Sequence, residues 1–143
     1  MTKDDFAAIS LVREWDINEI VALYRAGGWW KEEYDPDEIP RLIAGSFAFA
    51  VACEKDGGRT VGMGRVISDG ISDAYIQDLV VLPGFRGKGL GSKIVSCLVD
   101  QCKKEGISWI ALVAEPGSEQ FYQGLGFSPM EGHIPLIYRG GSP

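Results

Sequence analysis

The sequence predicts a mixed α+β protein of one domain, residues 1–143, with a mostly antiparallel sheet and helices packed against it. Residues 47–82 hold three apolar segments separated by turn sequences, which is typical of an antiparallel meander. Residues 94–106 then carry apolar side chains at helical spacing and precede an apolar strand, which indicates one right-handed parallel crossover. A length of 143 residues fits one domain with one hydrophobic core.

The N-terminal part is predicted to contain one strand and two helices. Ala7–Glu14 has the composition of a strand. Asp16 is suited to cap the helix that follows, and Glu19 completes an Asp-x-x-Glu variant of the capping box. This helix ends at the glycine pair that begins with Gly27. A second short helix is predicted over Asp35–Ser46, because a proline near its start suits the first helical turn.

The three strands of the meander are predicted over Phe47–Glu54, Arg59–Ile67 and Ala74–Leu82. Lys55–Gly58 is a hairpin turn sequence, and Ser68–Asp73 is a second turn. The meander therefore accounts for the central part of the sheet.

A long helix, a strand, a short helix and a last strand are predicted to follow. The apolar side chains on one face of the long helix are Ile94, Val95, Leu98, Val99 and Cys102, and the helix ends at Gly106. The later elements are a strand over Ser108–Ala114, a short helix over Glu115–Phe127 with Gly126 as its C-cap, and a strand over His133–Tyr138. Residues 1–6 and 139–143 are predicted to be frayed tails.

The distribution of charge argues against nucleic acid as a partner. The net charge is −6, and residues 1–58, with 12 acidic and 6 basic side chains, account for all of it. A nucleic-acid-binding protein would normally present a basic face. The acidic half mildly favours a cationic ligand there, and a solvated acidic surface explains it equally well.

The sequence also predicts neither a membrane protein nor a metal site. No apolar run approaches the roughly 18 residues needed to cross a bilayer, and "MTKDDFAAIS" lacks an apolar signal core. Cys53, Cys97 and Cys102 fit no metal-ligand spacing, and His133 is the only histidine. Reduced thiols in a cytoplasmic protein are the expected state of the cysteines.

The stretch "GFRGKGLGSKI", Gly84–Ile94, has four glycines and three cations, a composition that favours phosphate binding. It fails the Walker A pattern, because Leu82 stands where a glycine is required and Gly89 where a serine or threonine is required. It fails the dinucleotide fingerprint because Ser92 and Ile94 stand where the last glycine would have to be. What remains is Arg86–Gly91 between a strand and a helix, where backbone N–H groups and a helix N-terminus could hold a pyrophosphate. A glycine-rich turn with solvated cations is the alternative.

The longer stretch "LVVLPGFRGKGLGSKIV" resembles the acyl-CoA signature of the GNAT family of N-acetyltransferases, Arg/Gln-x-x-Gly-x-Gly/Ala after a strand. Arg86, Gly89 and Gly91 match its fixed positions, and "FYQGLGF" downstream resembles the family's Phe-Tyr-x-x-x-Gly-Phe segment. The resemblance covers about residues 7–138. It implies the GNAT fold, a sheet of about 6–7 strands with about four helices, in which two splayed parallel strands form the acyl-CoA cleft. These strands would be Ala74–Leu82 and Ser108–Ala114.

The resemblance further implies an acyltransferase that uses acetyl-CoA as donor substrate and a primary amine of a small molecule or peptide as acceptor. The amine attacks the thioester directly, through a tetrahedral intermediate whose oxyanion the backbone N–H of Leu79 stabilises. The residues implied to bind the donor are Leu79, Val80, Val81, Arg86, Gly87, Lys88, Gly89, Leu90, Gly91, Ser92 and Tyr122. A non-catalytic acyl-CoA-binding or regulatory module of the same fold is the alternative function.

The resemblance suggests Tyr122 as the acid that protonates the departing thiolate, although it could instead be a packing residue. Asp78 and Asp73 are the candidate bases, of which Asp78 is preferred, and a solvent-assisted route, with Tyr75 and Gln77 positioning a water, is the alternative. Strand alternation predicts that Asp73, Tyr75 and Gln77 share one face and that Asp78 lies on the other.

The acceptor site is predicted in Gly27–Glu38, a region that commonly lines the acceptor pocket in this family. Trp29, Trp30 and Tyr34 could form an aromatic wall beside an acidic rim, suited to an amine with apolar bulk. Alternatively, one tryptophan anchors the helices and the acids are solvated. Tyr75 and Gln77 are also candidate acceptor residues. A monomer and a homodimer both remain open.

Overall fold

The computed structural model of the protein describes residues 6–141. Its contacts divide the chain into two compact units, one ending at Leu112 and the other beginning at Val113, and each is described by itself. The prediction of a single domain stays a prediction. Of the predicted frayed tails, residues 1–5 and 142–143 lie outside the described residues.

The first unit contains one sheet of five strands in the order β1-β2-β3-β4-β5. The strands are β1 (Ala7–Leu11), β2 (Ala48–Glu54), β3 (Thr60–Ser68), β4 (Asp73–Val81) and β5 (Trp109–Ala111). Neighbours from β1 to β4 pair antiparallel, and β4 pairs with β5 in parallel. The predicted meander and the parallel crossover are therefore confirmed.

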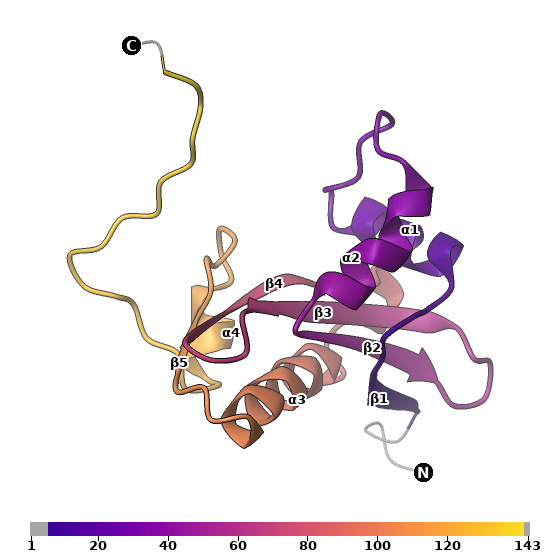
Figure 1. The fold of residues 1–143 in the computed structure, drawn as a ribbon. Coiled ribbons are helices and arrows are strands. Elements are labelled where there is room, and N and C mark those ends of the chain that lie inside the picture. The colour runs from indigo at the N-terminus through magenta and orange to yellow at the C-terminus, as the bar shows by residue number, and fades with distance from the viewer. Residues whose placement is uncertain (1–5, 142–143) are drawn as a thin grey trace. The chain divides into compact units, whose positions relative to one another are not determined.

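Helices cover both faces of this sheet (Figure 1). Helices α1 (Ile17–Ala26) and α2 (Ile39–Gly45) lie on one face, and α3 (Leu90–Lys104) lies on the other. A cluster of buried side chains from α1, α2, β2, β3 and β4, which includes Phe49 and Met63, forms the core beneath α1 and α2. Under α3, Gly62 and Gly64 of β3 leave room for Ile94 and Leu98, since a Cβ at either glycine would lie about 3.0 Å from an Ile94 atom.

The capping box predicted at the start of α1 forms only in half. The side chain of Asp16 accepts a hydrogen bond of 2.9 Å from the backbone N–H of Glu19. The Glu19 carboxylate does not return to Asp16; it accepts a 2.7 Å hydrogen bond from the hydroxyl of Thr60. Thr60 is buried and also accepts from the indole N–H of Trp15, so the acid is used to fasten α1 to β3.

Within residues 113–141 the second unit has one helix, α4 (Glu119–Gln123), which is shorter than the predicted Glu115–Phe127. Gly124, rather than Gly126, is its C-cap, although Gly126 does adopt a positive φ of 99°. The last predicted strand, His133–Tyr138, is wrong: these residues are extended but belong to no strand of the described chain. An extended segment becomes a stable strand only when a neighbour completes its hydrogen bonds, and composition does not supply one.

The fold class is nevertheless as predicted, a mixed α+β arrangement. The sheet has five strands within residues 6–141 rather than the expected six or seven. Besides the missing last strand, β5 is shorter than predicted and ends at Ala111.

Candidate active site

A β-bulge interrupts the pairing of β3 with β4. Met63 pairs with Val80 and Arg65 with Gln77, so one residue of β3, Gly64, lies opposite two residues of β4, Asp78 and Leu79. Asp78 has φ of 60°, the one positive value of a non-glycine residue in the described chain. A bulge of this kind bends a strand and re-aims its side chains and peptide groups.

The bulge overturns the predicted alternation along β4. Residues opposite each other in a pair share a face, so Gln77 lies on the same face as Arg65. The Arg65 side chain also contacts the Asp78 carboxylate, which places Asp78 beside Gln77 rather than across the sheet from it. The prediction assumed an uninterrupted period of two, and the extra residue breaks that period.

The other edge of β4 is open over most of its length. β5 pairs with it only at Asp73, Ala74 and Tyr75, so within the sheet described here the edge from Ile76 to Val81 has no strand partner. Leu79, Val80 and Val81, the predicted donor-binding residues, all lie on this stretch. The pairing of the two parallel strands therefore ends at Tyr75 and Ala111, and the bulge lies beyond that point on β4.

The glycine-rich loop joins the end of β4 to the start of α3. Gly87 and Gly89 have φ of 77° and 85°, a conformation that only glycine adopts without strain. Gly89 is the N-cap of α3, and the backbone N–H of Lys93 is bonded to its carbonyl. The preceding N–H groups, of Leu90, Gly91 and Ser92, have no partner within the helix. The loop thus has the backbone geometry of an anion cradle at a helix N-terminus.

Three cations lie at this loop, of which one is bonded to the backbone and another was not predicted. Arg86 donates from Nε to the carbonyl of Val81 at 2.9 Å, so it fastens the loop to the end of β4. The Lys88 ammonium lies 5.8 Å from the centre of the Phe85 ring, and the Arg59 guanidinium lies 5.5 Å from the same centre. Arg59 was not among the predicted residues, because it follows a hairpin turn far from the loop in sequence.

Asp78 is engaged by two donors. Its Oδ2 accepts a 2.7 Å hydrogen bond from the Tyr24 hydroxyl and a 2.6 Å bond from Arg65 Nε. The side chains of Arg65 and Asp78 are 17% and 20% exposed, which makes this ion pair far better shielded than the surface pairs of the protein. Burial, followed by the neighbouring Asp78 charge, raises the pKa of Tyr24 well above its ordinary value, so the phenol stays a neutral donor.

Tyr24 and Arg65 are site residues that sequence reasoning missed. A charged side chain in the middle of an apolar strand needs a buried partner, so Arg65 did carry a signal. Tyr24 carried none, since it has the spacing of an ordinary core residue of α1 and lies 54 positions from Asp78 in the chain.

Tyr122 lies in α4, in the second unit. Its ring contacts those of Phe121 and Phe127, with centres 5.0 and 5.9 Å away. Burial, together with the charge of Glu115, raises the pKa of its phenol. The Tyr122 side chain is therefore half-buried in a cluster of three aromatic rings, and its hydroxyl is protonated.

The predicted acceptor segment is less acidic than its sequence suggests. Glu32 pairs with Arg25 at 2.8 Å and Glu38 with Arg41 at 3.0 Å, while Asp35 caps the 3-10 turn Pro36–Glu38. Of the five acidic side chains in this segment, two are therefore paired with an arginine; the five are Glu32, Glu33, Asp35, Asp37 and Glu38.

Both tryptophans of this segment, Trp29 and Trp30, are half-buried and pack against the core. Trp29 also covers Gly27, where a Cβ would come within 2.6 Å of the indole, which is the expected position of a helix anchor. Trp30 and Tyr34 form an edge-on pair with ring centres 5.5 Å apart, and Tyr34 is 45% exposed.

A second exposed aromatic pair lies where β4 and β5 part. The rings of Tyr75 and Trp109 are 5.4 Å apart and 44% and 40% exposed. Tyr75 was a predicted acceptor residue, and Gln77, two positions along, is also exposed. Trp109 was missed because it reads as an ordinary strand residue.

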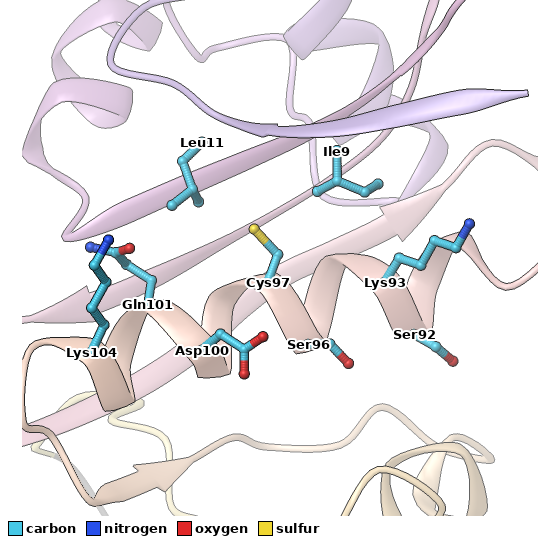
Figure 2. Close-up of a pocket in the computed structure, with 9 residues that line it drawn as sticks. All are labelled: Ile9, Leu11, Ser92, Lys93, Ser96, Cys97, Asp100, Gln101 and Lys104. Atoms are coloured by element: carbon cyan, nitrogen blue, oxygen red, sulfur yellow. The ribbon is translucent and has the colours of Figure 1, made fainter. Parts of the chain in front are cut away.

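An open groove lies elsewhere in the first unit, between β1 and α3 (Figure 2). This open groove, of about 590 Å³, is lined by Ile9 and Leu11 above and by α3 residues below, with Cys97 pointing toward β1. Among the predicted donor-binding residues it contains only Ser92. It is therefore not the predicted acyl-CoA site.

Within residues 6–141 no group of three or more His, Cys, Asp or Glu side chains is placed to hold a metal ion. No helix of the described chain is long and apolar enough to cross a bilayer. Cys53, Cys97 and Cys102 are free thiols, and burial raises the pKa of each.

A mixed sheet with a bulged strand beside a parallel neighbour, followed by a glycine turn into a helix, is the arrangement that the resemblance to the GNAT fold implied. The sequence profile of the Acetyltransferase (GNAT) family matches residues 10–127, and the chain belongs to the GNAT family. It is an acyltransferase of the N-acetyltransferase class, and members of this family use acetyl-CoA as substrate.

Known proteins agree with this assignment. The uncharacterized N-acetyltransferase ycf52 of Pyropia yezoensis is 35% identical over 128 residues, which are 87% of this chain and 73% of that protein. Serotonin N-acetyltransferase 2, chloroplastic, of Oryza sativa subsp. japonica is 42% identical over 71 residues, 50% of this chain and 36% of that protein. The GNAT family protein SP0256 of Streptococcus pneumoniae has the same fold, with a TM-score of 0.80, 23% identity and coverage of 95% and 99% of the two chains. These relatives favour the enzyme over the non-catalytic module.

Proposed function

We propose that this protein moves the acetyl group of acetyl-CoA to a primary amine of a small molecule or peptide. The observation that carries the proposal is the sequence of features along β4: a bulge, an open edge, and a glycine turn into α3. The pantetheine arm can hydrogen-bond along the open edge at Leu79, Val80 and Val81 as a further strand would. The pyrophosphate then reaches the turn.

The turn supplies the donor contacts through backbone and charge. Gly87 and Gly89 allow the N–H groups of Leu90, Gly91 and Ser92 to converge on an anion at the positive end of α3. Lys88 and Arg59 add positive charge beside Phe85, and Arg86 holds the loop in place.

In the proposed reaction, the amine nitrogen attacks the thioester carbon and the carbonyl oxygen becomes an oxyanion. The Leu79 N–H, on the bulge, donates to that oxygen. When the intermediate collapses, the C–S bond breaks and the thiolate takes a proton from the Tyr122 hydroxyl, while the proton that the nitrogen loses on forming the amide returns to the phenolate through water. The Tyr122 phenol is protonated at neutral pH, because its ordinary pKa already lies well above 7 and burial, with the charge of Glu115, raises that pKa further.

The acceptor must lose a proton before it attacks, because an alkylammonium has a pKa near ~10.4 in water. Asp78 was the candidate base, yet its Oδ2 already accepts from both Tyr24 and Arg65. The geometry favours the alternative route, in which a water held near the exposed Tyr75 and Gln77 takes the proton.

For the acceptor we propose an amine with an aryl or other apolar group. Three exposed or half-buried aromatic side chains, Trp30, Tyr34 and Tyr75, offer faces for cation–π and stacking contacts. Serotonin, in the name of the rice relative, is an arylalkylamine and belongs to this class.

A screen of arylalkylamines, polyamines, amino acids and peptide N-termini, read by release of the free thiol of CoA, tests this assignment. We expect arylalkylamines to give the highest kcat/KM, by about tenfold or more, because one buried aromatic contact accounts for about 1–2 kcal/mol. A preference for anionic acceptors would refute it. Binding of CoA without turnover of any amine would refute the transfer itself.

We also propose a homodimer, on the basis of the C-terminal segment. Met130, Ile134, Leu136, Ile137 and Tyr138 are 50–92% exposed, more apolar surface than an extended segment normally leaves in water. Light scattering coupled to size exclusion should give twice the mass of the 15.6 kDa chain. Deleting residues 133–143 should give a monomer; a full-length monomer would contradict the proposal.

For location we propose the cytoplasm, a reducing compartment that suits three free thiols. The chloroplast named for the rice relative is the alternative, and a fluorescent fusion of the full chain distinguishes the two.

A further inference from the structure

The Tyr24–Asp78–Arg65 cluster joins three elements at the bulge of β4. Tyr24 comes from α1, Arg65 from β3 and Asp78 from the bulge itself, and both donors meet at one carboxylate oxygen. Arg65 is held further by Ser46, at the C-terminus of α2, whose hydroxyl accepts from Nη1 at 3.4 Å and donates to the carbonyl of Leu42. The carboxylate is therefore fixed by groups whose own positions are fixed.

The residue so fixed has an unusual backbone conformation. Asp78 has φ of 60°, a region that a non-glycine residue occupies only when its surroundings hold it there. An aspartate tolerates this region better than most residues, and its side chain here is tied on one face of the sheet. The two hydrogen bonds thus act directly on the torsions of a single strained residue.

The next residue, Leu79, is held from the opposite face. A Cβ on Gly64 would lie 3.5 Å from Leu79, 3.0 Å from Ile94 and 3.2 Å from Leu98, so the missing side chain lets these three pack together. The peptide group between Asp78 and Leu79 is therefore clamped on one side by a polar cluster and on the other by α3. The N–H of Leu79 belongs to this peptide group.

We propose that Tyr24 and Arg65 are positioning residues, which act through the Asp78 carboxylate to set the direction of the Leu79 N–H. The inference rests on the proposed function, in which that N–H stabilises the oxyanion. An oxyanion donor works only at hydrogen-bond distance from the place where charge develops, so a small rotation of this peptide weakens it. In this account Asp78 is an acceptor that anchors the backbone, and it takes no proton from the substrate.

The test compares four variants of the full chain. Tyr24→Phe keeps the ring in the core and removes only the donor, and Asp78→Asn keeps an acceptor and tolerates positive φ but cannot act as a base. Asp78→Ala removes the anchor. Tyr138→Phe is the matched control, because it removes the same hydroxyl at a side chain that is 86% exposed and keeps the ring, the part of Tyr138 that the proposed dimer would use.

Tyr24→Phe and Asp78→Ala should each lower kcat about tenfold, with the KM for acetyl-CoA within about twofold of wild type. Asp78→Asn should retain kcat within about threefold. The pH profile of kcat should keep its shape in both Tyr24→Phe and Asp78→Asn. In ¹⁵N-labelled protein, the amide signal of Leu79 should shift in Tyr24→Phe and stay in place in Tyr138→Phe.

Three outcomes decide against parts of this account. If Tyr24→Phe matches Tyr138→Phe in kcat and in the Leu79 signal, the positioning role is overturned. If Asp78→Asn loses as much as Asp78→Ala and also loses one limb of the pH profile, Asp78 is a base and the role is again overturned. If the Leu79 signal shifts while kcat stays unchanged in every variant, the positioning stands and the proposed oxyanion role of Leu79 fails.

Discussion

Replacing Tyr122 with phenylalanine is expected to lower kcat about 100-fold, the usual scale for the loss of a general acid. The KM for acetyl-CoA should change by no more than about twofold, since the ring that remains keeps its packing. Phe121 and Phe127 hold that ring, with centres 5.0 and 5.9 Å away, and neither contact involves the hydroxyl. Steady-state kinetics with a saturating arylalkylamine measure both constants.

The Tyr122 prediction depends on the leaving group, and this provides a second check. An alkyl thiol such as that of CoA has a pKa of about 8.5, so its thiolate is helped by a proton donor as it leaves. A more acidic thiol leaves readily as the thiolate and gains little from such a donor. An acetyl donor with an electron-poor aryl thiol should therefore restore much of the activity of Tyr122→Phe. Tyr138→Phe should match wild type with both donors. Unchanged turnover of Tyr122→Phe with acetyl-CoA would remove the residue from the mechanism.

Replacing Gly89 with alanine is expected to raise the KM for acetyl-CoA about 30-fold, with kcat within about threefold of wild type. Gly89 has φ of 85° at the N-cap of α3, so a Cβ either strains the backbone or turns the following N–H groups away from the phosphate site. A charge-assisted hydrogen bond contributes about 1.5–3 kcal/mol, so one misdirected donor suffices for this effect. Isothermal titration with CoA checks the affinity directly.

Gly84 provides the matched control for this loop. It lies in the 3-10 turn Pro83–Phe85, its φ is not positive, and a Cβ there would meet no atom within 4 Å. Gly84→Ala should therefore bind CoA as wild type does. Equal affinity of Gly84→Ala and Gly89→Ala would contradict the assignment of the loop as a phosphate cradle.

The parts of this protein that local sequence controls were predicted well. Helix α3 follows the spacing of Ile94, Leu98 and Cys102, and all three are buried. The loop was predicted because two of its glycines, Gly87 and Gly89, are needed for a local reason, their positive φ. The turns of the meander were predicted for the same kind of reason. Periodicity and turn chemistry act over a few residues, and the printed sequence contains all of that information.

The failures have a common cause in pairing between distant segments. His133–Tyr138 has the composition of a strand and no partner in the described chain, so it forms none. Glu19 has the spacing of a capping residue but binds Thr60, 41 positions away. In each case a contact that the local pattern does not encode decided the outcome.

The glycine-rich loop and its place between a strand and a helix could thus be derived from the residues alone, as could the fold class, whereas the role of the loop in binding acyl-CoA came from the family resemblance. The face on which Asp78 lies could not, because it depends on the register in which Arg65 and Met63 meet β4. One extra residue in that register places Asp78 beside Arg65 and Tyr24 and turns the Leu79 peptide group. Register is a property of two strands together, and so the arrangement of the proposed catalytic groups is decided only when the sheet has formed.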